Sequence, residues 1–119
     1  MELMISGRHM DMDEGTKTYI EERMARLAKE YTKLTAARAV VDMERSWYLA
    51  EVHVTGKHLD LVAKSKSQDL LMSLDSAFGK LDKQLRRYLE RLQQHRGGGG
   101  AEAGEERVPV AGEDESGER

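Results

Sequence analysis

The long stretch from Ser67 to Arg96 has the spacing of an amphipathic helix, and it constrains the fold more than any other part of the chain. Its large apolar residues follow one another at intervals of three and four, which places them on one side of a helix. They are Leu71, Leu74, Phe78, Leu81, Leu85, Tyr88 and Leu92. A helix of this kind is stable in water when another element covers its apolar side, so the rest of the chain must supply an apolar surface.

Basic residues follow a second set of helical intervals in the same stretch. They are Lys80, Lys83, Arg87 and Arg91. At about 100° per residue they occupy a sector of roughly 80°, more than 90° away from the centre of the apolar side. This pattern predicts a cationic outer surface, for which a polyanion is the favoured partner. Charge alone leaves a second interpretation open, because many solvated helices carry similar basic residues.

A first helix is predicted from about Glu14 to Tyr31, with Asp13 as its N-cap. Its apolar positions again repeat at intervals of three and four: Ile20, Met24, Leu27, Tyr31 and Leu34. Basic residues lie away from them: Arg23, Arg26, Lys29 and Lys33. They either form ion pairs along the helix, as Glu22 with Arg26, or make a row beside the basic row of the second helix. Both interpretations stay open.

Between the helices the period changes to two, which is typical of strands with one buried face. The apolar positions are Ala37, Ala39, Val41 and Met43, then Ala50, Val52 and Val54, then Leu59, Leu61 and Ala63. Three such strands predict an antiparallel meander with turns at residues 44–46 and at Gly56-Lys57, where glycine would supply a positive φ. Residues 2–8 predict a further short strand with Leu3 and Ile5 on one side.

The order strand, helix, three strands, helix predicts a two-layer α+β fold, βαβββα, in which two parallel-lying helices pack on one face of a four-stranded sheet. We expect this domain to span residues 1–96. Residues 97–119 contain a run of glycines, seven acids and two arginines, a net charge of −5, and predict a linker with an acidic, disordered tail. Ser67 is the predicted N-cap of the last helix, and Gly79 within it suggests a close approach of another backbone or a ligand.

Several classes of chemistry find no support in the sequence. The chain has no cysteine, and its histidines lack the spacing of a metal site. No nucleophile or phosphate-binding motif is present. We therefore expect no enzyme activity, no cofactor, no metal and no small-molecule substrate. Without a signal segment or a membrane-length apolar run, the expected location is cytoplasmic, with no membrane contact.

What remains is a binding module. Rows of arginine and lysine suit a phosphate backbone, and structured RNA is read largely through its shape and backbone. The order of elements is also similar to that of double-stranded-RNA-binding domains, at the level of the fold alone.

Three segments carry a resemblance to a known family: Ile5-Ser6-Gly7-Arg8, the helical run 19–27 (YIEERMARL), and above all the run 80–88 (KLDKQLRRY). Over residues 1 to about 96 the chain resembles the short form of the ribosome hibernation promoting factor family, also called the ribosome-associated translation inhibitor or sigma-54 modulation family. The resemblance implies a βαβββα fold that binds ribosomal RNA of the small ribosomal subunit at the decoding region, where messenger RNA and the A- and P-site transfer RNAs lie. It also implies that the protein keeps idle ribosomes inactive during stress or stationary phase.

The RNA-contacting positions that the resemblance implies are Arg23, Arg26, Lys29, Lys80, Lys83, Arg86, Arg87 and Arg91, with Lys64-Ser65-Lys66 as a lesser candidate. Long members of the family carry a second domain that pairs ribosomes, so we expect this chain not to pair them by that route. We also expect a chain that is monomeric when free. The alternative function is a protein-interaction regulator, such as a modulator of sigma-54-dependent transcription, acting through its tail or the exposed face of its sheet.

Overall fold

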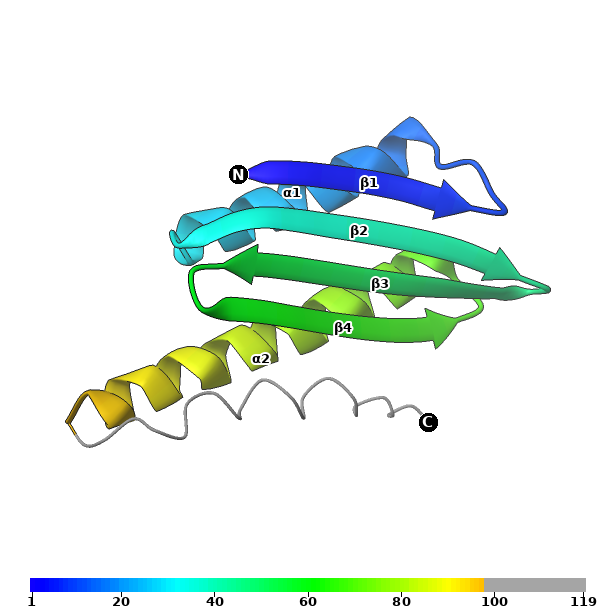
Figure 1. The fold of residues 1–119 in the computed structure, drawn as a ribbon. Helices are drawn as coiled ribbons and strands as arrows, with labels where there is room; N and C mark the ends of the chain where they lie inside the picture. Colours follow the sequence, from blue (N-terminus) through cyan, green and yellow to red (C-terminus); the bar gives the residue numbers. More distant parts are fainter. Residues whose placement is uncertain (98–119) are drawn as a thin grey trace.

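A computed structural model describes residues 1–97, in which four strands form one sheet and two helices cover one of its faces (Figure 1). In chain order the elements are β1 (Glu2–Arg8), α1 (Glu14–Glu30), β2 (Leu34–Glu44), β3 (Trp47–Gly56), β4 (Leu59–Ser67) and α2 (Leu70–Gly97). The strands lie in the order β1-β2-β3-β4. The predicted two-layer α+β fold is confirmed. Apart from Gly97, which ends α2, the predicted linker and tail lie outside the described residues.

β1 and β2 run parallel, whereas β2, β3 and β4 form the expected antiparallel meander. Two parallel neighbours need a crossover connection, and α1 provides it. α1 begins where predicted, because the Asp13 carboxylate accepts a hydrogen bond of 2.8 Å from the Thr16 backbone N–H. Its last residue is Glu30 and its C-cap is Tyr31, whose own N–H donates to the Leu27 carbonyl at 2.8 Å.

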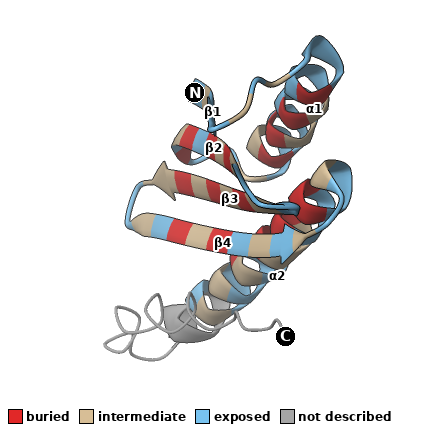
Figure 2. Ribbon diagram, turned by 90° about the vertical axis from the view of Figure 1, so that its right-hand side faces the viewer, coloured by how far each residue is buried: buried red, intermediate tan, exposed pale blue. Residues whose placement is uncertain are grey.

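The core lies between the helices and the sheet, and Figure 2 shows buried residues in both layers. Alternate residues of β2, β3 and β4 meet the apolar sides of α1 and α2, as the period of two predicts. The largest fully buried side chains are Phe78, Ile20, Met24, Leu74, Leu81, Leu85, Val41, Val52, Val54 and Ser73. Ser73 is the polar member of this set, and its hydroxyl donates to the Tyr48 carbonyl at 2.9 Å.

Two predicted core residues of α2 lie at the surface. Leu71 is 50% exposed and Leu92 is 41% exposed. Leu70 packs against the core in place of Leu71, because an interval of four to Leu74 serves as well as an interval of three. Leu92 is exposed because the end of α2 extends beyond the sheet (Figure 1). Tyr88 is half-buried.

Gly56 does not have the positive φ expected of it, and neither does any other described glycine. In the loop between β3 and β4 the positive φ belongs to His58, at 60°. Gly56 is needed for space, because a Cβ atom there would overlap the Lys33 carbonyl oxygen and lie 3.2 Å from the Leu34 Cα. The chain entering β2 therefore passes directly against the end of β3.

One expectation for α2 is wrong, and one explanation considered for Gly79 finds no support within the protein. Its N-cap is Asp69 rather than Ser67, since the Asp69 carboxylate accepts from the Met72 N–H at 3.0 Å. The Ser67 hydroxyl instead accepts from the Asp69 N–H at 3.2 Å, which shapes the turn before the helix. Gly79 is not closely approached within the protein, since no atom lies within 4 Å of where its Cβ would be.

α2 also covers the outer edge of β4. Three α2 side chains, each one turn after the last, donate to backbone carbonyls of β4 or the turn before it. Lys80 donates to Lys64 at 2.9 Å, Gln84 to Val62 at 3.1 Å and Tyr88 to His58 at 2.6 Å. These bonds occupy groups that could pair with another strand, and they fix the rotation of α2 about its axis.

Candidate RNA-binding surface of the two helices

The four basic residues of α2 lie in one sector of the helix, which extends from the solvent side toward β4. Lys83 and Arg87 are exposed, whereas Lys80 and Arg91 are half-buried. The hydrogen bond from the Lys80 ammonium to β4 shows that this end of the sector faces the strand. At about 100° per residue, Lys83 is then the member of this row that points most directly away from the sheet. Lys83 and Arg87 are thus the members of this row that are open to a ligand.

The side of α2 that faces α1 has a different composition. Asp75, Asp82 and Arg86 lie there, with the Arg86 guanidinium donating to the Asp82 carboxylate at 2.5 Å. Asp82 also acts on Tyr31 at the end of α1, where burial first and the nearby carboxylate second raise the pKa of the phenol. The basic rows of the two helices therefore do not adjoin each other, because these residues of α2 lie between them.

The basic residues of α1 turn stepwise from the interior toward solvent. Arg23, Arg26 and Lys29 are three residues apart, and each interval rotates the side chain by roughly 60° in the same direction. The Arg23 side chain is only 20% exposed and contacts α2. Arg26 and Lys29 are exposed. Among the predicted α1 contacts, these two are the ones presented to solvent.

Within residues 1–97, no hydrogen bond or ion pair joins the exposed cations Arg26, Lys29, Lys83 and Arg87 to another described residue. The other predicted site residues have intramolecular partners or are half-buried. Lys64 and Lys66 are exposed along β4, and the Lys66 ammonium lies 5.4 Å from the centre of the Trp47 ring. The cationic surface thus continues from α2 over the edge of the sheet, and we call Arg26, Lys29, Lys83 and Arg87 the outer cations.

Sequence spacing missed the groups that hold Arg23. Asp75 and Tyr19 both bind its guanidinium, and they come from different helices. Tyr19 lies four residues before Arg23 on α1, a spacing that indicates neighbours on one helix surface. A pattern within one helix carries no signal of the pair between Arg23 and Asp75, so only the three-dimensional arrangement reveals that pair.

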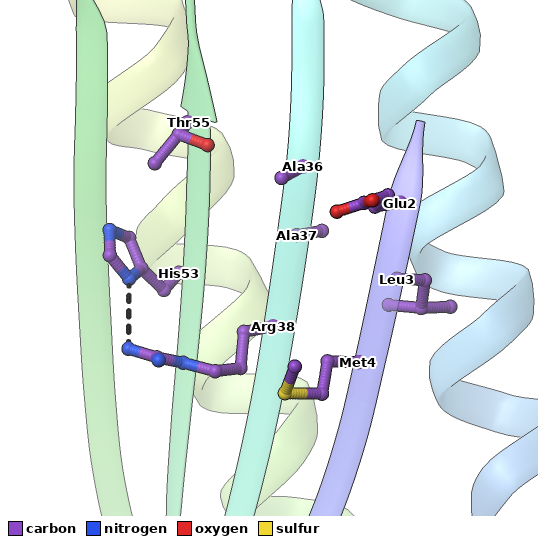
Figure 3. A pocket seen from close by; sticks show the side chains of 8 residues that line it. All are labelled: Glu2, Leu3, Met4, Ala36, Ala37, Arg38, His53 and Thr55. Carbon is purple, nitrogen blue, oxygen red and sulfur yellow. Dashed lines mark hydrogen bonds between the residues drawn. The ribbon is translucent and has the colours of Figure 1, made fainter.

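The uncovered face of the sheet has a shallow hollow of about 540 Å³ across β1, β2 and β3 (Figure 3). Its lining residues are Glu2, Leu3, Met4, Ala36, Ala37, Arg38, His53 and Thr55. His53 contacts Arg38 at 3.3 Å and also bonds to Asp60, so the polar groups here largely satisfy one another. No group of three or more potential metal ligands occurs among the described residues.

Comparison with known proteins identifies the family. A model of the family described as "Sigma 54 modulation protein / S30EA ribosomal protein" matches residues 3–93. The chain belongs to this family. The resemblance seen in the sequence is thereby confirmed, and the family is not one of enzymes.

Curated relatives of the chain are named ribosome hibernation promoting factors. The protein from Azotobacter vinelandii is 28% identical, over 76% of this chain and 85% of the relative. The protein from Pseudomonas putida is 26% identical, over 78% of this chain and 91% of the relative. The protein from Escherichia coli K12 is 24% identical, over 80% of this chain and all of the relative.

Solved structures share the fold. A ribosomal subunit interface protein from Coxiella burnetii superposes with a TM-score of 0.71 at 17% identity, covering 76% of this chain and 99% of that chain. The N-terminal domain of Thermus thermophilus Protein Y superposes with a TM-score of 0.67 at 23% identity, covering 74% of this chain and 99% of that chain. In the described part of the chain, neither helix is long and apolar enough to cross a lipid bilayer.

Proposed function

We propose that the chain is a ribosome hibernation factor that binds small-subunit ribosomal RNA at the decoding region and keeps idle ribosomes inactive. In this proposal the protein binds where messenger RNA and the A- and P-site transfer RNAs lie. Membership of the family supports the ribosome as the partner, together with the names of the relatives. Hibernation during stress or stationary phase, and a cytoplasmic location, belong to the same proposal.

The observation that supports the RNA contact is the exposure of the outer cations on α1 and α2. Ammonium and guanidinium groups without intramolecular partners can neutralise phosphates and release condensed counterions. Each of the two helices presents two of them, so the surface suits a folded RNA whose phosphates lie at fixed separations. Arg86, Arg91 and Lys80 contribute positive potential around these contacts rather than free donors, and Arg23 is treated separately below.

Sedimentation with purified small subunits tests the proposal. The wild-type chain should migrate with the subunits at about 50 mM salt and be released as salt rises to about 200 mM or above. The double variant Lys83→Glu, Arg87→Glu should lose this association while its thermal transition stays nearly unchanged, because both side chains are exposed.

A control of equal charge change guards against a purely general electrostatic effect. Arg45→Glu with Lys57→Glu alters two exposed residues in the loops at the two ends of the sheet. This variant should still bind, at somewhat lower affinity. If both double variants lose binding equally, the helical surface is not the specific contact.

Two other functions predict different results. A general double-stranded-RNA-binding protein would bind a plain RNA duplex in a gel shift as tightly as it binds the subunit. A protein-interaction regulator acting through the uncovered sheet face would lose activity on Arg38→Glu, which changes the hollow, and would tolerate Lys83→Glu with Arg87→Glu. Retention of subunit binding by the latter variant would favour that alternative.

A further inference from the structure

Arg23 lies between the two helices rather than on their outer surface. Its guanidinium Nη1 donates to the Asp75 carboxylate at 2.8 Å and to the Tyr19 hydroxyl at 2.8 Å. Its Cζ atom lies 4.9 Å from the centre of the Phe78 ring and 5.7 Å from that of Tyr19. The positive charge is therefore paired with a carboxylate and placed over two aromatic rings.

The partners of Arg23 also bind one another. The rings of Tyr19 and Phe78 meet edge to face, with centres 6.3 Å apart and planes at 76°. The Tyr19 hydroxyl lies 3.3 Å from the Asp75 carboxylate, and Phe78 is part of the buried core. We call Tyr19, Arg23, Asp75 and Phe78 the interhelical cluster. It joins α1 to α2 and anchors the junction in the core.

The cluster lies on the same two helices as the outer cations. Arg23 precedes Arg26 by three residues, and Asp75 precedes Lys83 by eight, which is about two turns of α2. Both helices rest on one sheet, and the cluster adds a direct link between them, so a change in the cluster can alter how far apart the α1 cations and the α2 cations are held. A folded RNA presents its phosphates at fixed positions, so helices whose separation is not held must be ordered when they bind. The same phosphates would then be contacted with a lower affinity.

We propose that Arg23 is a positioning residue and not a phosphate contact. Paired with Asp75, it sets the separation between the outer cations of α1 and those of α2, and thereby selects folded ribosomal RNA over flexible polyanions. This inference rests on the proposed function. It replaces the role of RNA contact that the family resemblance implied for Arg23.

The direction in which affinity changes when Asp75 is substituted distinguishes a positioning role from simple repulsion. Its side chain is 72% exposed, so its negative charge is presented toward solvent beside a surface proposed to bind phosphates. If its charge only repelled RNA, Asp75→Asn would tighten binding. If the ion pair positions the helices, the same substitution weakens binding, although it makes the protein more positive.

Binding to small subunits across a range of salt concentrations separates the two roles. We expect Asp75→Asn and Arg23→Gln each to weaken binding on the order of tenfold, with the double variant no weaker than either single variant, because the two residues act as one pair. The slope of log affinity against log salt should stay unchanged. Affinity for polyuridylate should also stay nearly unchanged, because a flexible strand adapts to a new separation.

Arg26→Gln is the matched control, since Arg26 is an exposed arginine three residues after Arg23 on α1. Loss of a true phosphate contact should lower the salt slope by about 0.7–0.9 and should add to the effect of Asp75→Asn. A tighter-binding Asp75→Asn, or an Arg23→Gln with the reduced slope of Arg26→Gln, would overturn the proposal.

A measurement without RNA tests the positioning itself. The chain has no cysteine, so spin labels can be attached to cysteines introduced at the exposed residues Glu22 and Ser76. The interlabel distance should be narrow in the otherwise wild-type chain and broader with Asp75→Asn. An unchanged distribution, or a broadened one with unaltered subunit binding, would refute the inference. Tyr19→Phe, which removes a single hydroxyl, should give a smaller change of the same kind if Asp75→Asn fails to fold.

The proposed function fails separately. In that case the wild-type chain and its Lys83→Glu, Arg87→Glu variant migrate alike with small subunits, whatever the spin labels show. Loss of the inference alone leaves that difference intact and removes only the effect of Asp75→Asn.

Discussion

Gly56 and Gly79 have opposite surroundings, and alanine should affect them in opposite directions. At Gly79 no atom lies within 4 Å of a Cβ position, so Gly79→Ala should raise the free energy of unfolding by up to about 1 kcal/mol through better helix propensity and a less flexible unfolded chain. Gly56→Ala should lower it, because the new methyl group would overlap the Lys33 carbonyl oxygen. Urea unfolding midpoints at neutral pH measure both, and a destabilising Gly79→Ala would contradict the open surroundings of that residue.

The contribution of the Asp13 cap of α1 to the stability of the fold should depend on pH. Hydrogen bonds from Thr16, chiefly its backbone N–H, hold the pKa of the Asp13 carboxyl below its usual value. A lowered folded-state pKa means that the ionised form stabilises the fold above the unfolded pKa of about 3.9, and that this contribution is lost as pH falls through the folded value. Asp13→Ala should therefore lower the thermal transition at pH 7, and the difference from wild type should shrink in acid.

Asp13→Asn is the informative comparison, because asparagine caps a helix without carrying a charge. We expect it to resemble wild type at pH 7 more closely than Asp13→Ala does. Its transition should also fall less steeply than that of wild type between pH 5 and about pH 3. Equal acid sensitivity of Asp13→Asn and wild type would show that other carboxyl groups control this range.

The limits of sequence reasoning are clearest at single residues with near-equivalent neighbours. Leu70 and Leu71 both fit the apolar spacing, and burial of Leu70 depends on how α2 is turned over the sheet. Ser67 and Asp69 are both good capping residues, and hydrogen bonding selects Asp69. The approach of Lys33 to Gly56 joins residues far apart in the chain, which no local pattern reports.

At the scale of elements, periodicity was sufficient for the type, order and pairing of nearly every helix and strand. It also placed the basic residues of α2 in one sector. The direction of that sector depends on tertiary contacts, namely the bonds from Lys80, Gln84 and Tyr88 to the edge of β4. These contacts separate Lys80, which supports the fold, from Lys83, which is free for a ligand.

Charge reversal at these two lysines should therefore have different effects. Lys80→Glu removes the hydrogen bond to the Lys64 carbonyl, so we expect a lower free energy of unfolding, by about 0.5–1.5 kcal/mol, as well as weaker subunit binding. Lys83→Glu should weaken binding and leave the unfolding transition nearly unchanged. Paired thermal melts and subunit sedimentation measure both properties, and equal stability of the two variants would show that the Lys80 bond does not contribute to the fold.

At the scale of the whole molecule, charge is distributed unevenly. Residues 97–119 carry a net charge of −5, whereas residues 1–96 carry +2. Acids on the same chain as an RNA-binding surface lower the potential that attracts phosphates, whether or not they touch that surface. Replacing the seven acids after residue 97 with their amides should therefore speed association with small subunits at low salt and tighten binding.

The salt dependence of this effect identifies its origin. The Debye length falls from about 10 Å at 0.1 M salt to about 3 Å at 1 M, so the advantage of the neutralised chain should fade as salt rises. A chain with residues 98–119 in scrambled order keeps the charge and should associate like wild type in stopped-flow measurements. If scrambling changes the rate as much as neutralisation does, the order of these residues matters, and the segment acts through a specific contact rather than through its charge.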